Sequence, residues 1–108
     1  MKRTSAVCRT AILATMLVGH TSGAADMPGA IDAHGCIACH AVGETRIGPA
    51  YAAIAARYAD ADEHTIEVLA QKIRHGGAGN WGVVPMIAHD TLEPAAARDI
   101  VRWILQQR

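Results

Sequence analysis

The sequence predicts an all-α fold of about four short helices. In several segments, apolar residues recur three or four positions apart, which is the spacing of one helix face. Glycine and proline gather between these segments, where they break helices. No convincing β-strand run or alternating pattern precedes Cys36. We therefore expect helices joined by loops, with no internal repeat and no low-complexity tract.

The first helix is expected over residues 29–37. Asp26 is a candidate N-terminal cap, and Pro28 suits the start of the helix because an N–H is not needed there. Residues 41–49 are predicted to be a loop. The helix breakers in this loop are Gly43, Gly48 and Pro49.

The second helix is expected over residues 50–59 and the third after a cap at Asp60 or Asp62. Each carries one apolar stripe at helical spacing. In the second helix the stripe is Tyr51, Ile54, Ala55 and Tyr58. In the third it is Ile66, Leu69, Ala70 and Ile73. The glycines at 76 and 77 should end the third helix.

The last helix is expected from Leu92 to about Gln107, with Thr91 as its cap and Pro94 in its first turn. Residues 79–86, which precede it, are too rich in glycine and proline to be helical. The predicted inner face of the last helix is Ala96, Ile100, Trp103 and Ile104.

Residues 1–24 have the pattern of a cleaved secretory signal peptide. The apolar core at 11–18 follows a basic stretch and is too short to span a bilayer, which takes about 20 residues. Small residues place the cut after Ala24 or Ala25, so Cys8 should be removed with the signal. The basic residues are Lys2, Arg3 and Arg9. We therefore expect export to the periplasm with no permanent membrane anchor.

The mature part, residues 25–108, should form one domain of mildly acidic charge. The full chain has 10 Lys+Arg and 10 Asp+Glu, and loss of the signal leaves seven basic against ten acidic residues. A nucleic-acid partner would require a clustered basic surface, which the sequence lacks. About 84 residues are few for a core made only of side chains, and the chain has no Phe.

Residues 36–40 have the form Cys-x-x-Cys-His, the attachment signature of a c-type haem. One helical turn places Cys36 and Cys39 on one face, where each thiol can add to a porphyrin vinyl group. The neutral imidazole of His40 can then bind the iron. A flat, largely apolar cofactor would also supply the missing interior of a small domain.

Two other interpretations of this motif exist. A thioredoxin-like redox pair would require a βαβ setting, which is not evident before Cys36. A structural zinc ion would require a fourth ligand. Any of His34, His64, His75 and His89 could supply it, so zinc stays open at this stage.

The mature chain resembles the small bacterial class I c-type cytochromes, the short monohaem type of periplasmic respiration. The resemblance extends from the first helix to the C-terminus and depends on the order and spacing of five blocks. These blocks are residues 35–40 (GCIACH), 47–51 (IGPAY), 72–77 (KIRHGG), 79–86 (GNWGVVPM) and 101–105 (VRWIL). It implies one covalent haem c, bound through Cys36 and Cys39, and electron transfer rather than enzyme catalysis.

The resemblance implies that Met86 is the second axial ligand, 46 residues after His40. A thioether is a soft ligand that favours reduced iron, so a His/Met pair raises the potential. Without the resemblance, Met86 could equally fill a gap in the core. Met27 is the other methionine of the mature chain, but it precedes the first helix.

Three further residues have roles implied by the resemblance. The backbone carbonyl of Pro49 would accept the free ring N–H of His40. Trp81 would donate its indole N–H to a haem propionate, and Lys72 would neutralise a propionate. From the residues alone, Pro49 could simply break a loop, Trp81 could be a core indole and Lys72 a solvated charge.

The chain departs from the family pattern after Met86, where Ile87-Ala88-His89 replaces the usual prolines and asparagine. His89 could contact the sulfur, point outward or compete for iron. Ile31 stands where relatives usually have an aromatic residue, so its contact with Trp103 should be small.

The leading functional hypothesis is an outer-sphere electron carrier between a quinol-oxidising complex or dehydrogenase and a terminal reductase or oxidase. One alternative is the electron-accepting haem subunit of a periplasmic dehydrogenase. Another is a haem with an open sixth site that binds ligands or peroxide. Redox partners would dock on an apolar patch around the haem edge. The candidates for this patch are Ile37, Val83, Val84, Ile87 and Ala88.

Overall fold

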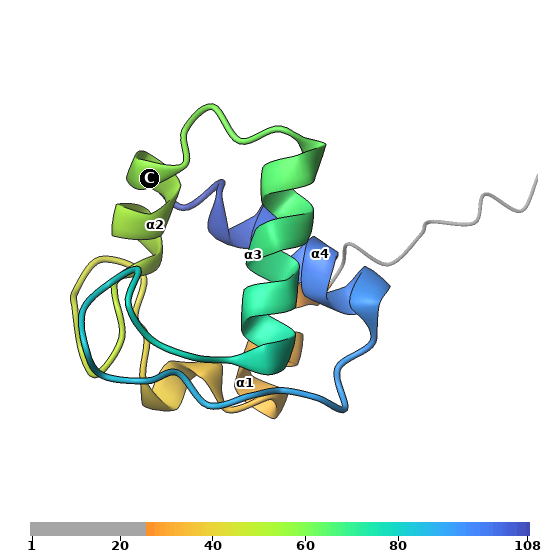
Figure 1. The fold of residues 1–108 in the computed structure, drawn as a ribbon, viewed down its shortest axis with the longest axis horizontal. Helices are drawn as coiled ribbons and strands as arrows, with labels where there is room; N and C mark the ends of the chain where they lie inside the picture. Colours follow the sequence, from red (N-terminus) through yellow and green to blue (C-terminus); the bar gives the residue numbers. More distant parts are fainter. Residues whose placement is uncertain (1–25) are drawn as a thin grey trace, which may run out of the picture.

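The computed structural model describes residues 26–108, so the predicted signal segment lies outside the described residues. This part of the chain contains four α-helices and one short 3-10 helix, η1 (Figure 1). Their bounds are α1 (Met27–Ala33), η1 (Cys36–Ala38), α2 (Tyr51–Arg57), α3 (Glu63–His75) and α4 (Pro94–Ile104). Two isolated bridges and no named strand occur in it, which confirms the all-α prediction.

The predicted helix over residues 29–37 is two helices. Asp26 caps α1 as expected, with its carboxylate accepting from the backbone N–H of Gly29 at 3.1 Å. Gly35 then has a φ of +70°, a left-handed conformation that ends one helix and starts η1. The prediction of one continuous helix was wrong because this glycine turns the chain immediately before the first motif cysteine.

Both ends of α3 match the sequence pattern. Asp62, and not Asp60, caps the helix. Its carboxylate accepts hydrogen bonds from the backbone N–H of Thr65 at 2.8 Å and from the Thr65 hydroxyl at 2.7 Å. Gly76 ends the helix with a φ of +69°. Ile66, Ala70 and Ile73 are buried as predicted, and Leu69 is partly buried.

Helix α4 is shorter at both ends than predicted. Thr91 is not its cap, because Pro94 is the first helical residue and Glu93 takes the cap position without a side-chain hydrogen bond. A proline disfavours helical backbone in the residue before it, so the helix cannot begin at Leu92. The buried residues are Ala97, Ile100, Val101 and Ile104, whereas Ala96 and Trp103 are only partly buried.

Helix α4 is the common support of the domain, because it contacts α1, α2 and α3. By contrast, no Cα atoms of α2 and α3 come within 8 Å of one another, and Figure 1 shows these helices apart. The core cluster gathers mainly on α3 and α4. Its members are Ile31, Tyr51, Ile66, Ala70, Ile73, Leu92, Ala97, Ile100, Val101 and Ile104. No helix within residues 26–108 has the length and apolar character to cross a bilayer.

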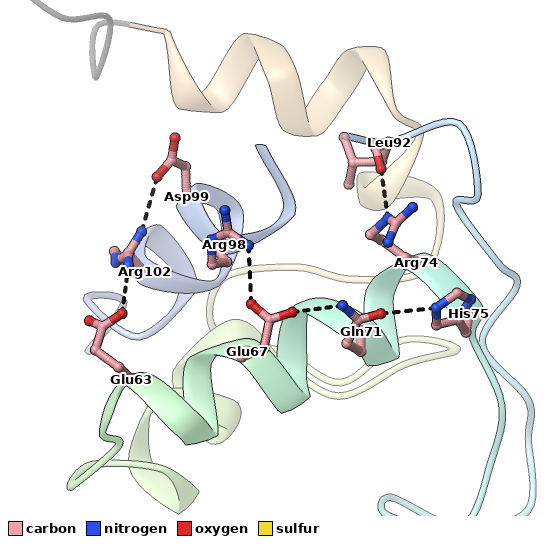
Figure 2. Close-up of polar contacts among 9 residues, drawn as sticks. All are labelled: Glu63, Glu67, Gln71, Arg74, His75, Leu92, Arg98, Asp99 and Arg102. Atoms are coloured by element: carbon pink, nitrogen blue, oxygen red, sulfur yellow. Dashed lines mark hydrogen bonds and ion pairs between the residues drawn. The ribbon is translucent and has the colours of Figure 1, made fainter. Parts of the chain in front are cut away.

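Polar contacts join the outer faces of α3 and α4 (Figure 2). Two ion pairs join the helices, Arg98–Glu67 at 3.1 Å and Arg102–Glu63 at 2.8 Å, and Arg102 also pairs with Asp99 within α4 at 3.2 Å. Arg74 also donates to the carbonyl of Leu92 at 2.9 Å, which ties α3 to the segment before α4. Because the pairs are solvent-exposed, we expect them to fix the relative position of the helices more than to add stability.

Asp62→Ala should lower the urea midpoint of unfolding at pH 7, because the first turn of α3 loses its cap. Two hydrogen bonds lower the pKa of Asp62 below its ordinary 3.8. The one from the Thr65 hydroxyl has the larger effect, and the one from the Thr65 backbone N–H the smaller. A carboxylate with a lowered folded pKa stabilises the protein above its unfolded pKa, and this stabilisation disappears as the pH falls through the folded pKa. The difference in urea midpoint between the variant and the wild type should therefore be largest at pH 7 and should decrease as the pH falls below 3.8.

Asp60→Ala is the matched control, because this neighbouring aspartate is exposed and does not cap the helix. It should leave the midpoint unchanged. A difference for Asp62→Ala that persists undiminished at acid pH would contradict the assignment of the cap.

Candidate functional site

One pocket brings together all seven residues singled out from the sequence. They are Cys36, Cys39, His40, Pro49, Lys72, Trp81 and Met86. The rest of the wall is largely apolar and comes from three helices and from the loops between them. These apolar residues include Ile54 of α2, Leu69 and Ile73 of α3, and Val101 and Ile104 of α4. The pocket therefore lies where α2 and α3 make no direct contact.

The two motif cysteines lie on a single turn at η1 and are not joined to one another. The backbone N–H groups of Cys39 and His40 both donate to the carbonyl of Cys36, at 3.2 and 3.0 Å. Burial raises the pKa of the Cys36 thiol above its ordinary 9.0. A thioredoxin-like redox pair would require a βαβ setting, and residues 26–108 contain no named strand.

The described residues do not form a structural zinc site around this motif. Within residues 26–108 no group of three or more His, Cys, Asp or Glu side chains is placed to hold a metal ion. Of the four histidines considered as a fourth zinc ligand, only His89 lines the pocket. Within the described residues the motif therefore lacks the clustered third and fourth ligands that a structural zinc ion requires.

His40 is buried, with 8% of its surface exposed, and its ring is fixed on two sides. Its Nδ1 lies 2.7 Å from the carbonyl oxygen of Pro49. Because a carbonyl can only accept, Nδ1 is the nitrogen that donates, and Nε2 is the nitrogen left to bind a ligand. Gly48 packs so closely against the ring that a Cβ at this position would overlap it. The imidazole is therefore held in one orientation by Pro49 and Gly48.

The segment after His40 folds back to create this environment. His40 pairs with Thr45 in an antiparallel bridge, and the backbone N–H of Gly48 donates to the carbonyl of Cys39 at 2.8 Å. The N–H of Tyr51 then donates to the carbonyl of Ala41 at 2.9 Å. The predicted loop over residues 41–49 thus brings Pro49 back to His40, the residue directly before the loop.

Tyr51 contacts the histidine in a way that the sequence did not indicate. Its ring stacks on His40 with centroids 5.5 Å apart and 18° between the planes, and it meets Trp103 edge-on at 5.5 Å. The hydroxyl is buried and has no hydrogen-bond partner in residues 26–108. Burial raises the pKa of Tyr51 to about 12, with a smaller contribution from the nearby Cys36. From the sequence, Tyr51 was identified as part of an apolar stripe and of the block at residues 47–51, but not as a contact of His40.

Met86 is attached by its backbone to the end of α3. It pairs with Gly77 through two hydrogen bonds of 3.0 Å, one in each direction. Gly76 has a positive φ, and a Cβ there would overlap the Met86 carbonyl oxygen, so only glycine suits this approach. Three residues later, the N–H of His89 donates to the carbonyl of Ile73 at 3.2 Å. The thioether is therefore presented to the pocket by a backbone with little freedom.

Trp81 and Lys72 line the same pocket from less buried positions. Trp81 is 43% exposed, and the guanidinium of Arg57 lies 4.6 Å from the centre of its ring. Lys72 is partly buried on the last turn of α3. Sequence analysis missed Arg57, because no local signal connects a residue of α2 with a loop 23 positions later.

Gly48→Ala should destabilise the protein by about 1–3 kcal/mol, because the new methyl group must displace the His40 ring or the backbone. Gly43→Ala is the control in the same loop, since a Cβ there meets no atom within 4 Å. Urea unfolding of both variants would measure the difference. Equal stability of the two variants would show that Gly48 does not pack against the ring.

Tyr51→Phe should keep or increase the free energy of unfolding, by up to about 1 kcal/mol, because it removes a buried hydroxyl without a partner and keeps the ring stack. Tyr51→Ala, which also removes the ring, should be strongly destabilising. Chemical denaturation of both variants would separate the hydroxyl from the ring. A marked loss of stability in Tyr51→Phe would mean that the hydroxyl does have a partner.

The chain is similar to small bacterial cytochromes in sequence and in structure. The family model "Cytochrome c" matches residues 29–108. Cytochrome c-552 of Nitrosomonas europaea is 38% identical over 92 residues, which cover 85% of each chain. Cytochrome c-551 of Pseudomonas aeruginosa is 38% identical over 74 residues, 68% of this chain and 69% of that one. The crystal structure of the Nitrosomonas protein matches with a TM-score of 0.69 and 36% identity, covering 75% of this chain and 99% of that chain.

The donor set of the pocket fits the cofactor of this family. Two thiols lie one turn apart, the His40 imidazole keeps Nε2 available, and a thioether and apolar side chains complete the wall. The chain belongs to the cytochrome c family, as a small class I c-type cytochrome that carries one covalently attached haem c and transfers electrons rather than acting as an enzyme.

Proposed function

We propose that this protein is a periplasmic one-electron carrier whose haem is bound through Cys36 and Cys39 and ligated by His40 and Met86. It would carry electrons from a quinol-oxidising complex or dehydrogenase to a terminal reductase or oxidase. The observation that supports this most is the single pocket that collects two thiols, an oriented imidazole and a thioether.

The residues around each proposed ligand suit electron transfer. When bound, the haem supplies a one-electron iron couple. The Pro49 carbonyl holds His40 in one orientation and makes its imidazole a better donor. The pairing with Gly77 restrains Met86, whose thioether favours the reduced state. If His40 and Met86 hold the iron, their restrained surroundings would keep the reorganisation small, and no coordination position would be left for a substrate.

The proposal assigns Trp81 and Lys72 to the haem propionates. Both residues line the pocket, and both carry N–H groups that can donate to a carboxylate. Lys72 adds a positive charge, which makes such a hydrogen bond stronger. These two residues would place the propionates on the side of the pocket formed by α3 and the loop that follows it.

Redox partners would dock on the apolar residues around the pocket. All five predicted residues of this patch, Ile37, Val83, Val84, Ile87 and Ala88, are exposed, and Val83 reaches 91%. Val84 and Ile87 also line the pocket, so the patch adjoins it. An exposed apolar surface of limited size suits brief docking. The small net charge leads us to expect weak dependence of the transfer rate on salt.

Met86→Ala should lower the midpoint potential and let the reduced protein bind carbon monoxide, because the iron loses its thioether ligand. Met27→Ala is the control, since Met27 lies in α1 and does not line the pocket. Spectroelectrochemistry and carbon monoxide difference spectra would measure both effects. An unchanged spectrum and potential in Met86→Ala would exclude the proposed ligand and favour a haem with an open sixth site.

The wider proposal is tested on material taken from the periplasm. A pyridine haemochrome spectrum and an intact mass should give one haem, retained under denaturation, on a chain cut after Ala24 or Ala25. Colourless protein with two free thiols would overturn the proposal. Co-purification with a catalytic chain at fixed stoichiometry would instead identify a dehydrogenase subunit.

A further inference from the structure

The loop that carries Trp81 has few restraints of its own. This segment, residues 76–85, is called here the Trp81 loop. Four of its glycines have a positive φ, between 69° and 113°. They are Gly76, Gly77, Gly79 and Gly82. Because glycine has the largest conformational freedom in the unfolded chain, ordering such a loop is costly, and contacts from outside it are needed.

The Trp81 loop is anchored at one end by the pairing of Gly77 with Met86, and internally by a 2.8 Å hydrogen bond from Gly79 to Gly82. Neither contact includes Trp81 itself or connects the loop to α2. The indole is 43% exposed, so burial contributes only part of what holds it.

Arg57, the last residue of α2, supplies the missing connection. Its Nη1 donates to the carbonyl of Asn80 at 2.5 Å. The same guanidinium lies 4.6 Å from the ring centre of Trp81 and 5.8 Å from that of Tyr58. One planar cation thus binds the loop backbone through an N–H and the indole through its face.

Arginine is suited to this double contact, and lysine is not. A guanidinium is planar, so it can lie against an aromatic ring while its edge donates hydrogen bonds. A lysine ammonium keeps the charge but is not planar. It could therefore make one of the two contacts but not both at once. Arg57 itself does not line the pocket, whereas Tyr58, Asn80 and Trp81 do.

We propose that Arg57 is a positioning residue that clamps the Trp81 loop onto α2 and so fixes Trp81 at the wall of the haem pocket. The inference builds on the proposed function, because it gives Trp81 a fixed position from which to meet a propionate.

The experiment compares Arg57→Ala and Arg57→Lys with Arg108→Ala in the haem-loaded protein. Arg108 is a control for the lost positive charge, since it lies exposed at the C-terminal end of the chain. Hydrogen exchange of the Trp81 indole N–H and of the amides of residues 77–84 is followed by NMR in the reduced state. The Trp103 indole N–H, in α4, serves as an internal reference.

Arg57→Ala should speed the exchange of the Trp81 indole by about tenfold, as expected for loss of a cation–π contact and a charged hydrogen bond. Arg57→Lys should give an intermediate rate, and Arg108→Ala the wild-type rate. Trp103 should stay unchanged in all variants. Wild-type exchange in Arg57→Ala, or equal acceleration at Trp103, would overturn the clamp.

The same samples separate this inference from the proposed function. A haemochrome assay of the wild type reports whether haem is attached, and its absence would count against the proposed function alone. The ratio of the Trp81 to the Trp103 exchange rate is measured separately and decides the role of Arg57.

Discussion

The hydrogen bond between His40 Nδ1 and the Pro49 carbonyl is the constraint on which the rest of the site depends. A buried imidazole with an unpaired N–H would be costly, and a free ring could present either nitrogen to the pocket. The fold-back of residues 41–49 removes both problems, because it brings an acceptor to one nitrogen and leaves the other available. Gly48 permits the close approach, since no side chain separates the backbone from the ring.

The packing of the helices explains why the domain has room for a cofactor. Helix α4 supports the other three helices, whereas α2 and α3 do not approach each other closely. Small residues such as Ala70 and Ala97 let α3 and α4 come together, and the buried side chains there form the core. The space between α2 and α3 is lined by apolar groups and by the sulfur and nitrogen donors. A bound haem would thus complete the interior as well as carry the electron.

Local patterns predicted the helices well where a local interaction determines them. Asp62 caps α3 and Gly76 ends it, because both effects require only residues a few positions apart. The errors arose where two local signals competed. Gly35 ends the helix that was expected to continue from the Asp26 cap to Ile37, and Pro94 prevents the helix start that Thr91 suggested. In both cases backbone geometry prevailed over the side-chain pattern.

The sequence by itself determined the chemistry of attachment, since two thiols and an imidazole within five residues must share one turn of chain. The sequence also indicated Met86 as the second ligand, through the spacing and order of the blocks shared with the family. Only the tertiary structure decided that Tyr51 stacks on His40, that Gly77 pairs with Met86 and that Arg57 reaches Trp81. These contacts join segments 9 to 24 positions apart, and no periodicity or short motif encodes which distant side chains will meet once the helices have packed.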